Sequence, residues 1–282
     1  MKTVLVTGAN GALGRVMTAQ MANEGYRVFA ADRVVHGKDD IELDVCDQKK
    51  VAGVIADTKP DLLVHLAAAF TDDFEAAYAL NVEATRNILN QVKAETRPIR
   101  VVLIGSAAEY GFIRSEDNPI REDHLLTPLS IYGLTKAWQS QLAGFFASQG
   151  VDVIVARIFN LEGPDLSERL FVGRVQKQIR EIQAGQRQNI EVGPLSAIRD
   201  YISLKDATRQ LIAIAKHGQS GQIYHVASGN PVVMRDLLAR TLARYGLNMS
   251  IVREAAVLSN RTGYDVPEIY ADISRTKQLL SL

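Results

Sequence analysis

The chain has 282 residues, of which 32 are basic and 32 are acidic, so its formal net charge is zero. That balance argues against a nucleic-acid-binding surface and favours a small-molecule ligand. No apolar run has membrane-spanning length and no signal-peptide pattern is present, so we expect no membrane partner. Cys46 is the only cysteine, which excludes a disulfide framework and a cysteine zinc site and favours a reducing cytoplasm. No metal site is predicted, because the histidines lack ligand spacing; they are His36, His65, His124, His217 and His225.

The first predicted element is a buried strand over residues 2–7, followed by a glycine-rich turn and a helix over 12–24. The glycines of this turn are three residues apart, which directs unpaired backbone N–H groups and the positive helix end toward a phosphate. A side chain at these positions would hold a pyrophosphate away from the backbone. The alternative is a glycine-rich loop without a ligand. The expected dinucleotide contacts are Gly8, Asn10, Gly11, Ala12, Leu13 and Gly14.

The second predicted strand, over residues 26–31, ends in an acidic residue. Asp32 stands at the distance from the glycines where a carboxylate accepts hydrogen bonds from an adenosine ribose. It would repel a 2′-phosphate, so NAD is the favoured cofactor. Arg33 could instead bind a 2′-phosphate, which keeps NADP as the second option.

Two further short strands are predicted over residues 41–45 and 61–66. Asp44, on the first, would accept from the adenine amine, or alternatively cap the helix that begins near Asp47. Small side chains after the second strand would let the backbone approach a cofactor closely. The contacts assigned to these two strands are Asp44, Val45, Leu66, Ala67 and Ala68.

A helix over residues 74–93 carries Asn81, a further expected cofactor contact, and a buried strand follows over 100–105. Strands that alternate with helices in this way predict a parallel sheet covered by helices on both faces, a doubly wound α/β fold. Ligands bind such sheets beyond the carboxyl ends of the strands. We therefore expect the glycine turn, the acidic residue and Ser106 to share one crevice.

Tyr132 and Lys136 stand four residues apart at the start of a predicted helix, so their side chains project from one face. A neighbouring ammonium is expected to lower the pKa of the phenol toward the working range and make it a proton-transfer group. Ser106 is the third catalytic candidate, as a hydroxyl that binds a substrate oxygen. The alternatives are a core-edge aromatic beside a solvated amine, and a serine that caps the turn before Ala107.

Eight motifs occur along the chain in the order seen in the extended short-chain dehydrogenase/reductases. The chain resembles this family of NAD(P)-dependent sugar-nucleotide epimerases, dehydratases and reductases over nearly its whole length. The motifs are Thr7-Gly-x-x-Gly-x-x-Gly14, Asp44-Val45, His65-Leu-Ala-Ala68, Asn81-Val82, Ser106-x-x-x-Tyr110-Gly111, Tyr132-x-x-x-Lys136, Arg157-x-Phe-Asn160-x-x-Gly163-Pro164 and Arg199-Asp200-Tyr201.

The resemblance implies a Rossmann-like cofactor domain over residues 1–164, to which later strands return, and a smaller mixed α/β substrate lobe over 165–282. It implies that Tyr132 is the acid/base and that Lys136 holds the nicotinamide ribose. Arg199 would hold the diphosphate of a sugar nucleotide, unless it forms a salt bridge to Asp200 or Asp206. Arg169 and Arg174 are further basic candidates. The other implied contacts are Phe159 for the cofactor, and Ser106, Ala107, Tyr132 and Asn160 for the substrate.

Within the family, the likeness is closest to reductases of GDP-linked 4-keto-6-deoxy sugars. The residues that carry it are Ile104–Gly111, Arg157–Asn160 and Ile190–Asp200. Ala107 and Ala108 argue against a 4,6-dehydratase, because methyl groups cannot transfer protons. The predicted activity is NAD(P)H-dependent reduction of a 4-keto-6-deoxy sugar nucleotide. The alternatives are a sugar-nucleotide 4-epimerase and a non-catalytic dinucleotide-binding protein, and a homodimer through a four-helix bundle is expected in each case.

Overall fold

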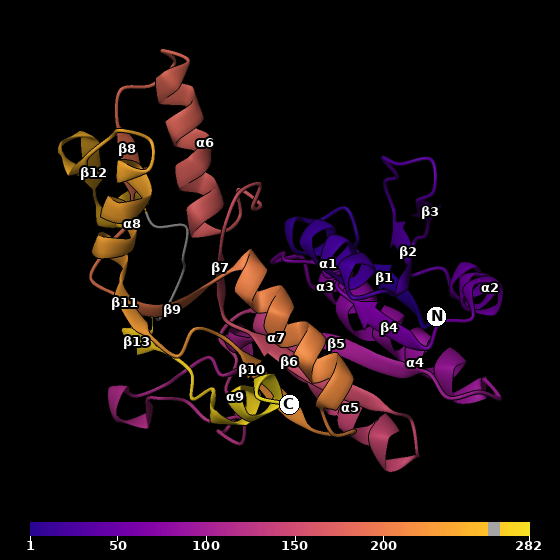
Figure 1. The fold of residues 1–282 in the computed structure, drawn as a ribbon. Helices are drawn as coiled ribbons and strands as arrows, with labels where there is room; N and C mark the ends of the chain where they lie inside the picture. The colour runs from indigo at the N-terminus through magenta and orange to yellow at the C-terminus, as the bar shows by residue number, and fades with distance from the viewer. Residues whose placement is uncertain (259–265) are drawn as a thin grey trace.

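The computed structural model describes residues 1–258 and 266–282. Its largest sheet has seven strands, all parallel, in the order β10-β6-β5-β4-β1-β2-β3 (Figure 1). This arrangement is the predicted doubly wound sheet. The strands are β1 (Thr3–Thr7), β2 (Arg27–Asp32), β3 (Ile41–Glu42), β4 (Leu62–His65), β5 (Arg100–Ser106), β6 (Val153–Ile158) and β10 (Ile223–Val226).

The two faces of the sheet bury alternate side chains of the same strand. On β1, Val4 and Val6 belong to one apolar core, whereas Leu5 belongs to the other, as the two-residue period of a strand requires. The first core packs under α1 (Ala12–Asn23) and α7 (Leu204–His217), and the second under α2, α4 and α5. The helices of the second face are α2 (Gln48–Thr58), α4 (Ala84–Ala94) and α5 (Ile131–Ser148).

The helix predicted over residues 74–93 is continuous but changes its pitch. It consists of α3 (Phe74–Tyr78), a π-helical turn over Ala79–Glu83 and then α4. The π turn places one extra residue in the helix at Asn81, and such single turns occur frequently at functional sites.

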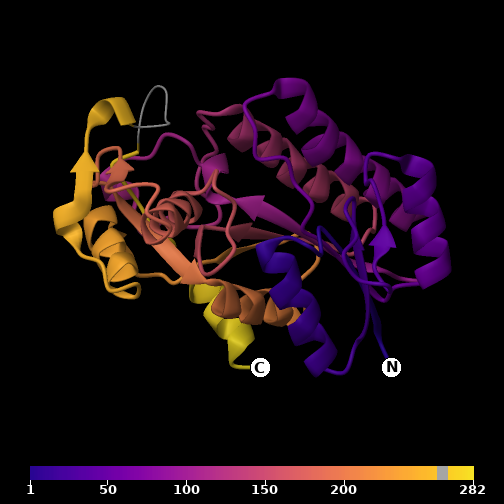
Figure 2. The same cartoon turned by 90° about the horizontal axis from the view of Figure 1, so that it is seen from above.

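The second lobe lies to one side of the sheet, as both views show (Figures 1 and 2). Its own core is formed by α6 (Phe171–Gln183), α8 (Met234–Ala243) and short strands. In this lobe β9 (Ile198–Ser203) pairs with three neighbours, and a parallel pair lies apart from it. The remaining strands are β7 (Asn160–Glu162), β8 (Ile190–Val192), β11 (Pro231–Val233), β12 (Val252–Glu254) and β13 (Glu268–Ile269).

The C-terminal part of the chain returns to the first sheet. β10 pairs with β6 at the edge, and α9 (Ser274–Leu280) packs against α7 and β10. Short 3-10 turns span Ala107–Glu109, Ser115–Asp117, Met249–Ile251 and Ala256–Leu258. Within the described part of the chain, no helix combines the length and apolarity that a membrane crossing needs.

Candidate active site

The carboxyl ends of neighbouring strands bring the predicted site residues to one edge of the sheet. Thr7 at the end of β1 is in register with Ala31 of β2 and His65 of β4. Ser106 ends β5, two strands from β1. The glycine turn, Asp32, the alanines after β4 and Ser106 therefore lie along one edge of the sheet, where doubly wound sheets bind their ligands in a crevice.

The three glycines of the turn have different roles in the structure. Gly8 has a φ of 71°, and a Cβ on it would lie 2.6 Å from the backbone nitrogen of Ala67. A Cβ on Gly14 would lie 2.3 Å from the carbonyl oxygen of Gly8, so both positions are closed by the fold. Gly11 is exposed, and the nearest atom to its Cβ would be the Gly8 oxygen at 3.3 Å. Because Gly11 is exposed and has no side chain, its backbone is accessible to a ligand.

The N-terminus of α1 fits an anion. Its N-cap is Gly11, no side chain caps it and its first turn contains no acidic residue. The first N–H groups of a helix have no intrahelical acceptor, and the helix dipole favours negative charge at this end. These groups, at Ala12 and Leu13, are where the pyrophosphate of a dinucleotide would bind.

Asp32 lies at the other side of the turn. One carboxylate oxygen accepts from the backbone nitrogen of Asn10 at 2.9 Å, and the other accepts from Val34 at 3.4 Å. Arg33 is exposed. The carboxylate is held beside the glycine turn, where a ribose hydroxyl would lie, and this geometry fits NAD.

Asp44 does not cap the helix that follows it. Its carboxylate accepts from the backbone nitrogen of Cys46 at 2.9 Å, whereas Asp47 caps α2 by accepting from Lys49 and Lys50. The capping alternative for Asp44 is therefore wrong. Val45 is buried in the core next to it.

Ser106 and Tyr132 meet at the crevice. Ser106 caps the short turn after β5, since its hydroxyl accepts from the nitrogen of Ala108 at 3.2 Å, and it is also hydrogen-bonded to the Tyr132 phenol. Tyr132 stands in the first turn of α5, which Ser130 caps. Its ring packs edge-on against Phe70, with centroids 4.7 Å apart. The capping role and the catalytic role of Ser106 are thus compatible.

The predicted lowering of the tyrosine pKa by the lysine is wrong for the protein without cofactor. Burial raises the pKa of Tyr132 to about 12, although the hydrogen bond with Ser106 acts in the opposite direction, and Glu109 raises it further. Burial also lowers the pKa of Lys136 to about 8, partly offset by Glu109. The physical reason is that desolvation disfavours both charged forms. It exceeds the opposing hydrogen bond with Ser106 at Tyr132 and the opposing charge of Glu109 at Lys136.

The ammonium of Lys136 is 1% exposed and donates to Oε1 of Gln139. Gln139 in turn donates to the hydroxyl of Thr85 at 2.7 Å. An ammonium has three donors, and the described part of the chain shows an acceptor for one of them, so the other two could reach ribose hydroxyls. Sequence reasoning missed Gln139, although its position three residues after Lys136 on one helix face indicates contact.

Asn81 supports the loop that borders the cofactor crevice. Its amide oxygen accepts from the nitrogen of Ala69 at 2.9 Å, and its amide nitrogen donates to the carbonyl of Ala69 and the hydroxyl of Thr135, both at 3.0 Å. Both amide hydrogens are thereby used within the protein. The Asn81 amide thereby links Ala69, in the segment after β4, to Thr135 of α5, the residue before Lys136.

The predicted substrate residues lie where the two lobes meet. Asn160, on β7, donates to the carbonyl of Asp200 at 2.9 Å. Arg199 is 4% exposed and donates to the carbonyl of Ile198 at 2.8 Å. Phe159 lies in a core with Tyr110 and His225, so its ring is enclosed by protein.

The alternative role of Arg199 is a salt bridge to Asp200 or Asp206, and both of these carboxylates accept other hydrogen bonds. The carboxylate of Asp200 accepts from the nitrogens of Ser228 and Gly229 at 2.8 and 2.9 Å, and that of Asp206 accepts from Ser203 at 2.7 Å. Both carboxylates thus have other partners. Of the two further basic candidates, Arg169 donates to the carbonyl of Phe70 and Arg174 lies on α6.

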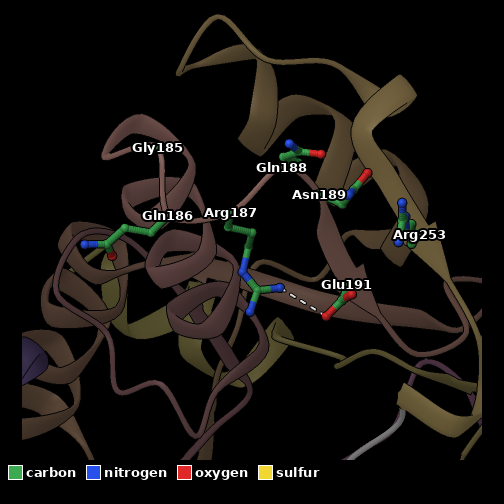
Figure 3. A pocket seen from close by; sticks show the side chains of 7 residues that line it. All are labelled: Gly185, Gln186, Arg187, Gln188, Asn189, Glu191 and Arg253. Atoms are coloured by element: carbon green, nitrogen blue, oxygen red, sulfur yellow. Dashed lines mark hydrogen bonds and ion pairs between the residues drawn. The ribbon is translucent and has the colours of Figure 1, made fainter.

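A pocket in the second lobe is lined by none of these residues (Figure 3). In it the guanidinium of Arg187 points toward Glu191, 3.1 Å away, and also pairs with Glu181. Its lining comprises Gly185, Gln186, Arg187, Gln188, Asn189, Glu191 and Arg253. No group of three metal-binding side chains occurs among residues 1–258 and 266–282.

The glycine turn, the parallel sheet and the Ser106, Tyr132 and Lys136 set define a dinucleotide-dependent oxidoreductase of the short-chain type. The model of the NAD dependent epimerase/dehydratase family matches residues 4–227. The chain belongs to this family, as the resemblance predicted.

Three known proteins illustrate the relationship. The chain is 27% identical to GDP-6-deoxy-D-mannose reductase of Pseudomonas aeruginosa over 261 residues, 90% of this chain and 83% of the relative. The solved structure of RMD from Pseudomonas aeruginosa complexed with NADPH matches with a TM-score of 0.85 at 21% identity, covering 100% of this chain and 91% of that chain. UDP-glucose 4-epimerase from Brucella ovis, in complex with NAD, matches with a TM-score of 0.85 at 23% identity, covering 100% and 93%. At these identities the structures establish the fold, and the predicted α/β class is confirmed.

Proposed function

We propose that this protein uses NAD(P)H to reduce a 4-keto-6-deoxy sugar nucleotide, with a GDP-sugar favoured. The observation that carries the proposal is the hydrogen bond of Ser106 with the Tyr132 phenol at the carboxyl end of β5, with Lys136 one turn later on α5. It is supported by the similarity to GDP-6-deoxy-D-mannose reductase over 90% of the chain. A binding-only protein would have no use for a half-buried phenol one helical turn from a buried ammonium.

The chain's own residues would orient the ketone and supply its proton. The bound nicotinamide supplies the hydride, while Lys136 would hold the ribose and the first turn of α1 the pyrophosphate. Ser106 would donate a hydrogen bond to the C4 oxygen, and Tyr132 would give its proton to the alkoxide that develops there. Because burial raises the pKa of Tyr132 to about 12, the phenol is protonated at neutral pH and is ready to act as an acid.

The geometry after β5 argues against a dehydratase. Water elimination needs a second acid/base pair beside the substrate. Ala107 and Ala108 offer only methyl groups there, and the nearest carboxylate, Glu109, is 0% exposed and bonded to Arg157 and Ser140. A carboxylate enclosed in this way cannot exchange protons with a sugar.

A spectrophotometric assay tests the proposal against the epimerase alternative. NADH or NADPH is mixed with the enzyme and a 4-keto-6-deoxy sugar nucleotide carrying GDP, dTDP or UDP. Steady loss of nicotinamide absorbance supports the reductase. Interconversion of 4-hydroxy sugar nucleotides without net loss of NADH would show an epimerase instead.

The role of Tyr132 has its own test. Tyr132→Phe removes the acid and should lower kcat by about 10²–10⁴-fold, while NAD(P)H still binds in a fluorescence titration. A matched control is Tyr78→Phe, whose ring packs against Phe74 and Trp138. Near-normal turnover of the Tyr132 variant would show that another group is the acid.

We further propose that NAD(H) is the preferred cofactor, because the backbone N–H of Asn10 holds the Asp32 carboxylate beside the glycine turn, where it would repel a 2′-phosphate. Exchange of Asp32 for Ala should raise the affinity for NADPH relative to NADH in fluorescence titrations of both. Equal ratios in the two proteins would contradict this assignment.

We also propose a cytoplasmic homodimer in which α4 and α5 pair with the same helices of a second copy. The two helices pack side by side over one core, and Phe145 on α5 is 56% exposed. Light scattering of the purified protein should give twice the mass of one chain, and Phe145→Glu should shift it toward the monomer. A monomeric wild type would contradict the dimer.

A further inference from the structure

A buried ion pair lies directly behind Ser106. The carboxylate of Glu109 accepts from Nη2 of Arg157 at 2.8 Å and from Nε at 3.1 Å. Both residues are 0% exposed. Burying two charges is costly and rarely adds stability compared with apolar residues of similar size, so the pair calls for an explanation other than stability.

The same carboxylate bonds to both elements that carry the catalytic residues. Oε1 of Glu109 accepts from the backbone nitrogen of Ser106 at 2.6 Å, and Oε2 accepts from the hydroxyl of Ser140 at 2.7 Å. Ser140 follows Lys136 by four residues on α5, on the same helix face. One side chain thus joins the end of β5 to the helix that carries Tyr132.

The contact with Ser106 is a capping box, in which the serine caps a short turn and the glutamate three residues later returns to the serine nitrogen. A capping box does not require a buried glutamate. Here Gly105 leaves room for the carboxylate, because a Cβ on that residue would lie 2.6 Å from Oε1. The lack of a side chain at Gly105 therefore makes room for the Glu109 carboxylate.

We propose that Glu109 is a positioning residue, whose charged carboxylate fixes Ser106 against the Tyr132 and Lys136 helix and sets the field in which these groups exchange protons. The inference rests on the proposed ketone reduction, in which Ser106 and Tyr132 act on the C4 oxygen. Arg157 holds the carboxylate from β6, on the side away from the crevice.

The charges around Glu109 support this role. Its negative charge raises the pKa of both Tyr132 and Lys136. At Tyr132 this effect adds to the larger effect of burial, and at Lys136 it opposes it. On its other side, Nη1 of Arg157 donates to the hydroxyl of Tyr110 at 2.7 Å and to the carbonyl of Glu122 at 3.3 Å. His225 is bonded to Tyr110, and burial lowers its pKa to about 4, so it is neutral at working pH. The carboxylate of Glu122 also faces this cluster, 3.9 Å from Nδ1 of His225, and burial raises its pKa.

The test compares Glu109→Gln with Ser140→Ala and with the control Ser148→Ala. Glutamine keeps an oxygen for the Ser106 nitrogen but removes the charge and places donors opposite Arg157 and Ser140. Ser148 is on the same helix but bonds only within its own turn, to Phe145. We expect kcat of Glu109→Gln to fall about 10- to 100-fold. KM should change less than about threefold.

The pH profile separates positioning by a charge from general support of the fold. Without the negative charge the pKa of Tyr132 should be lower, so the acid form is lost earlier and the alkaline limb of kcat moves to lower pH. Glu109→Asp retains the charge and should keep the limb near its wild-type position. A uniform loss of kcat with an unmoved limb in Glu109→Gln overturns the proposal.

If Glu109→Gln does not fold, Ser140→Ala decides the question. It removes the link to α5 and keeps the charge, so kcat should fall about 5- to 10-fold with the alkaline limb unmoved. Turnover equal to that of Ser148→Ala would overturn the proposal.

A measurement without substrate keeps this inference separate from the proposed function. Lysines labelled with ¹³C at Cε are titrated by NMR, with Lys136→Met to assign the signal of Lys136. In Glu109→Asp, which retains the charge, the pKa of Lys136 should stay near the wild-type value of about 8, whereas in Glu109→Gln it should fall further. If the pKa of Lys136 is unchanged in Glu109→Gln, the role of Glu109 is overturned, even if the enzyme is a reductase. If that pKa shifts but the wild type does not reduce the ketone, only the proposed function is rejected.

Discussion

Replacement of Lys136 by methionine should stabilise the cofactor-free protein while it abolishes turnover. The ammonium is 1% exposed, and burial lowers its pKa from 10.5 to about 8 despite the charge of Glu109. This change corresponds to about 3 kcal/mol of free energy lost by the charged form on folding. Methionine has similar length and no charge, but it leaves Oε1 of Gln139 without its donor, which costs about 1 kcal/mol. The expected net gain at pH 7 is about 2 kcal/mol.

The gain should shrink at alkaline pH. The folded-state pKa of Lys136 lies below the unfolded value, so between about pH 8 and 10.5 the unfolded chain binds the proton and the folded protein does not. Wild-type stability therefore rises with pH in this window, by about 1.4 kcal/mol per pH unit relative to the variant.

Urea unfolding at pH 7 and pH 9.5, followed by the fluorescence of the only tryptophan, Trp138, measures both effects. Lys136→Arg keeps a buried charge and serves as the control that should not gain stability. The reasoning would be refuted by a methionine variant no more stable than wild type at pH 7, or by a difference that is the same at both pH values. In that event the buried ammonium would not be the source of the cost.

Two further predictions concern the glycine turn and a buried histidine. Gly14→Ala should destabilise the protein by about 3 kcal/mol, because its methyl would overlap the Gly8 oxygen. Gly11→Ala should keep the wild-type melting temperature but weaken NADH binding about tenfold or more. Equal melting temperatures of the two variants would contradict this difference. Burial lowers the pKa of His65 to about 3, so the unfolded chain takes up a proton below pH 6.5 that the folded protein does not. Wild type should lose about 1.4 kcal/mol per pH unit between pH 6 and 4 from this residue, and His65→Gln, measured by urea unfolding across that range, should lose correspondingly less.

The strand and helix pattern of the first half was accessible from the sequence because buried parallel strands and amphipathic helices have strong periods. The π turn at Asn81 was not, since one extra residue in a helix leaves the pattern on either side intact. The short strands β7, β11 and β13 were missed for a different reason. Two or three residues are too few to show an alternation, and these strands exist because β9 offers them partners.

The sequence indicated which residues lie at the sheet edge and on the first turns of α5, but not the pKa values of their side chains. Residue types and spacing indicated Ser106, Tyr132 and Lys136, because strand ends and helix faces follow from local sequence. The pKa of the phenol depends on burial, which the sequence does not show. Glu109 could have been found from its spacing to Ser106, which is that of a capping box, but the guanidinium of Arg157, 48 positions later, is placed there only by the sheet.

The position of β10 at the edge of the main sheet bears on how the protein is made. All six residues of β6 are buried, yet this strand has no neighbour on one side until residues 223–226 have left the ribosome. Through that interval of synthesis an apolar strand edge is open to pairing with other chains, which is the usual route to aggregation. Truncation before β10 should therefore yield insoluble protein even though the residues of the glycine turn and of the Ser106, Tyr132 and Lys136 set are all present.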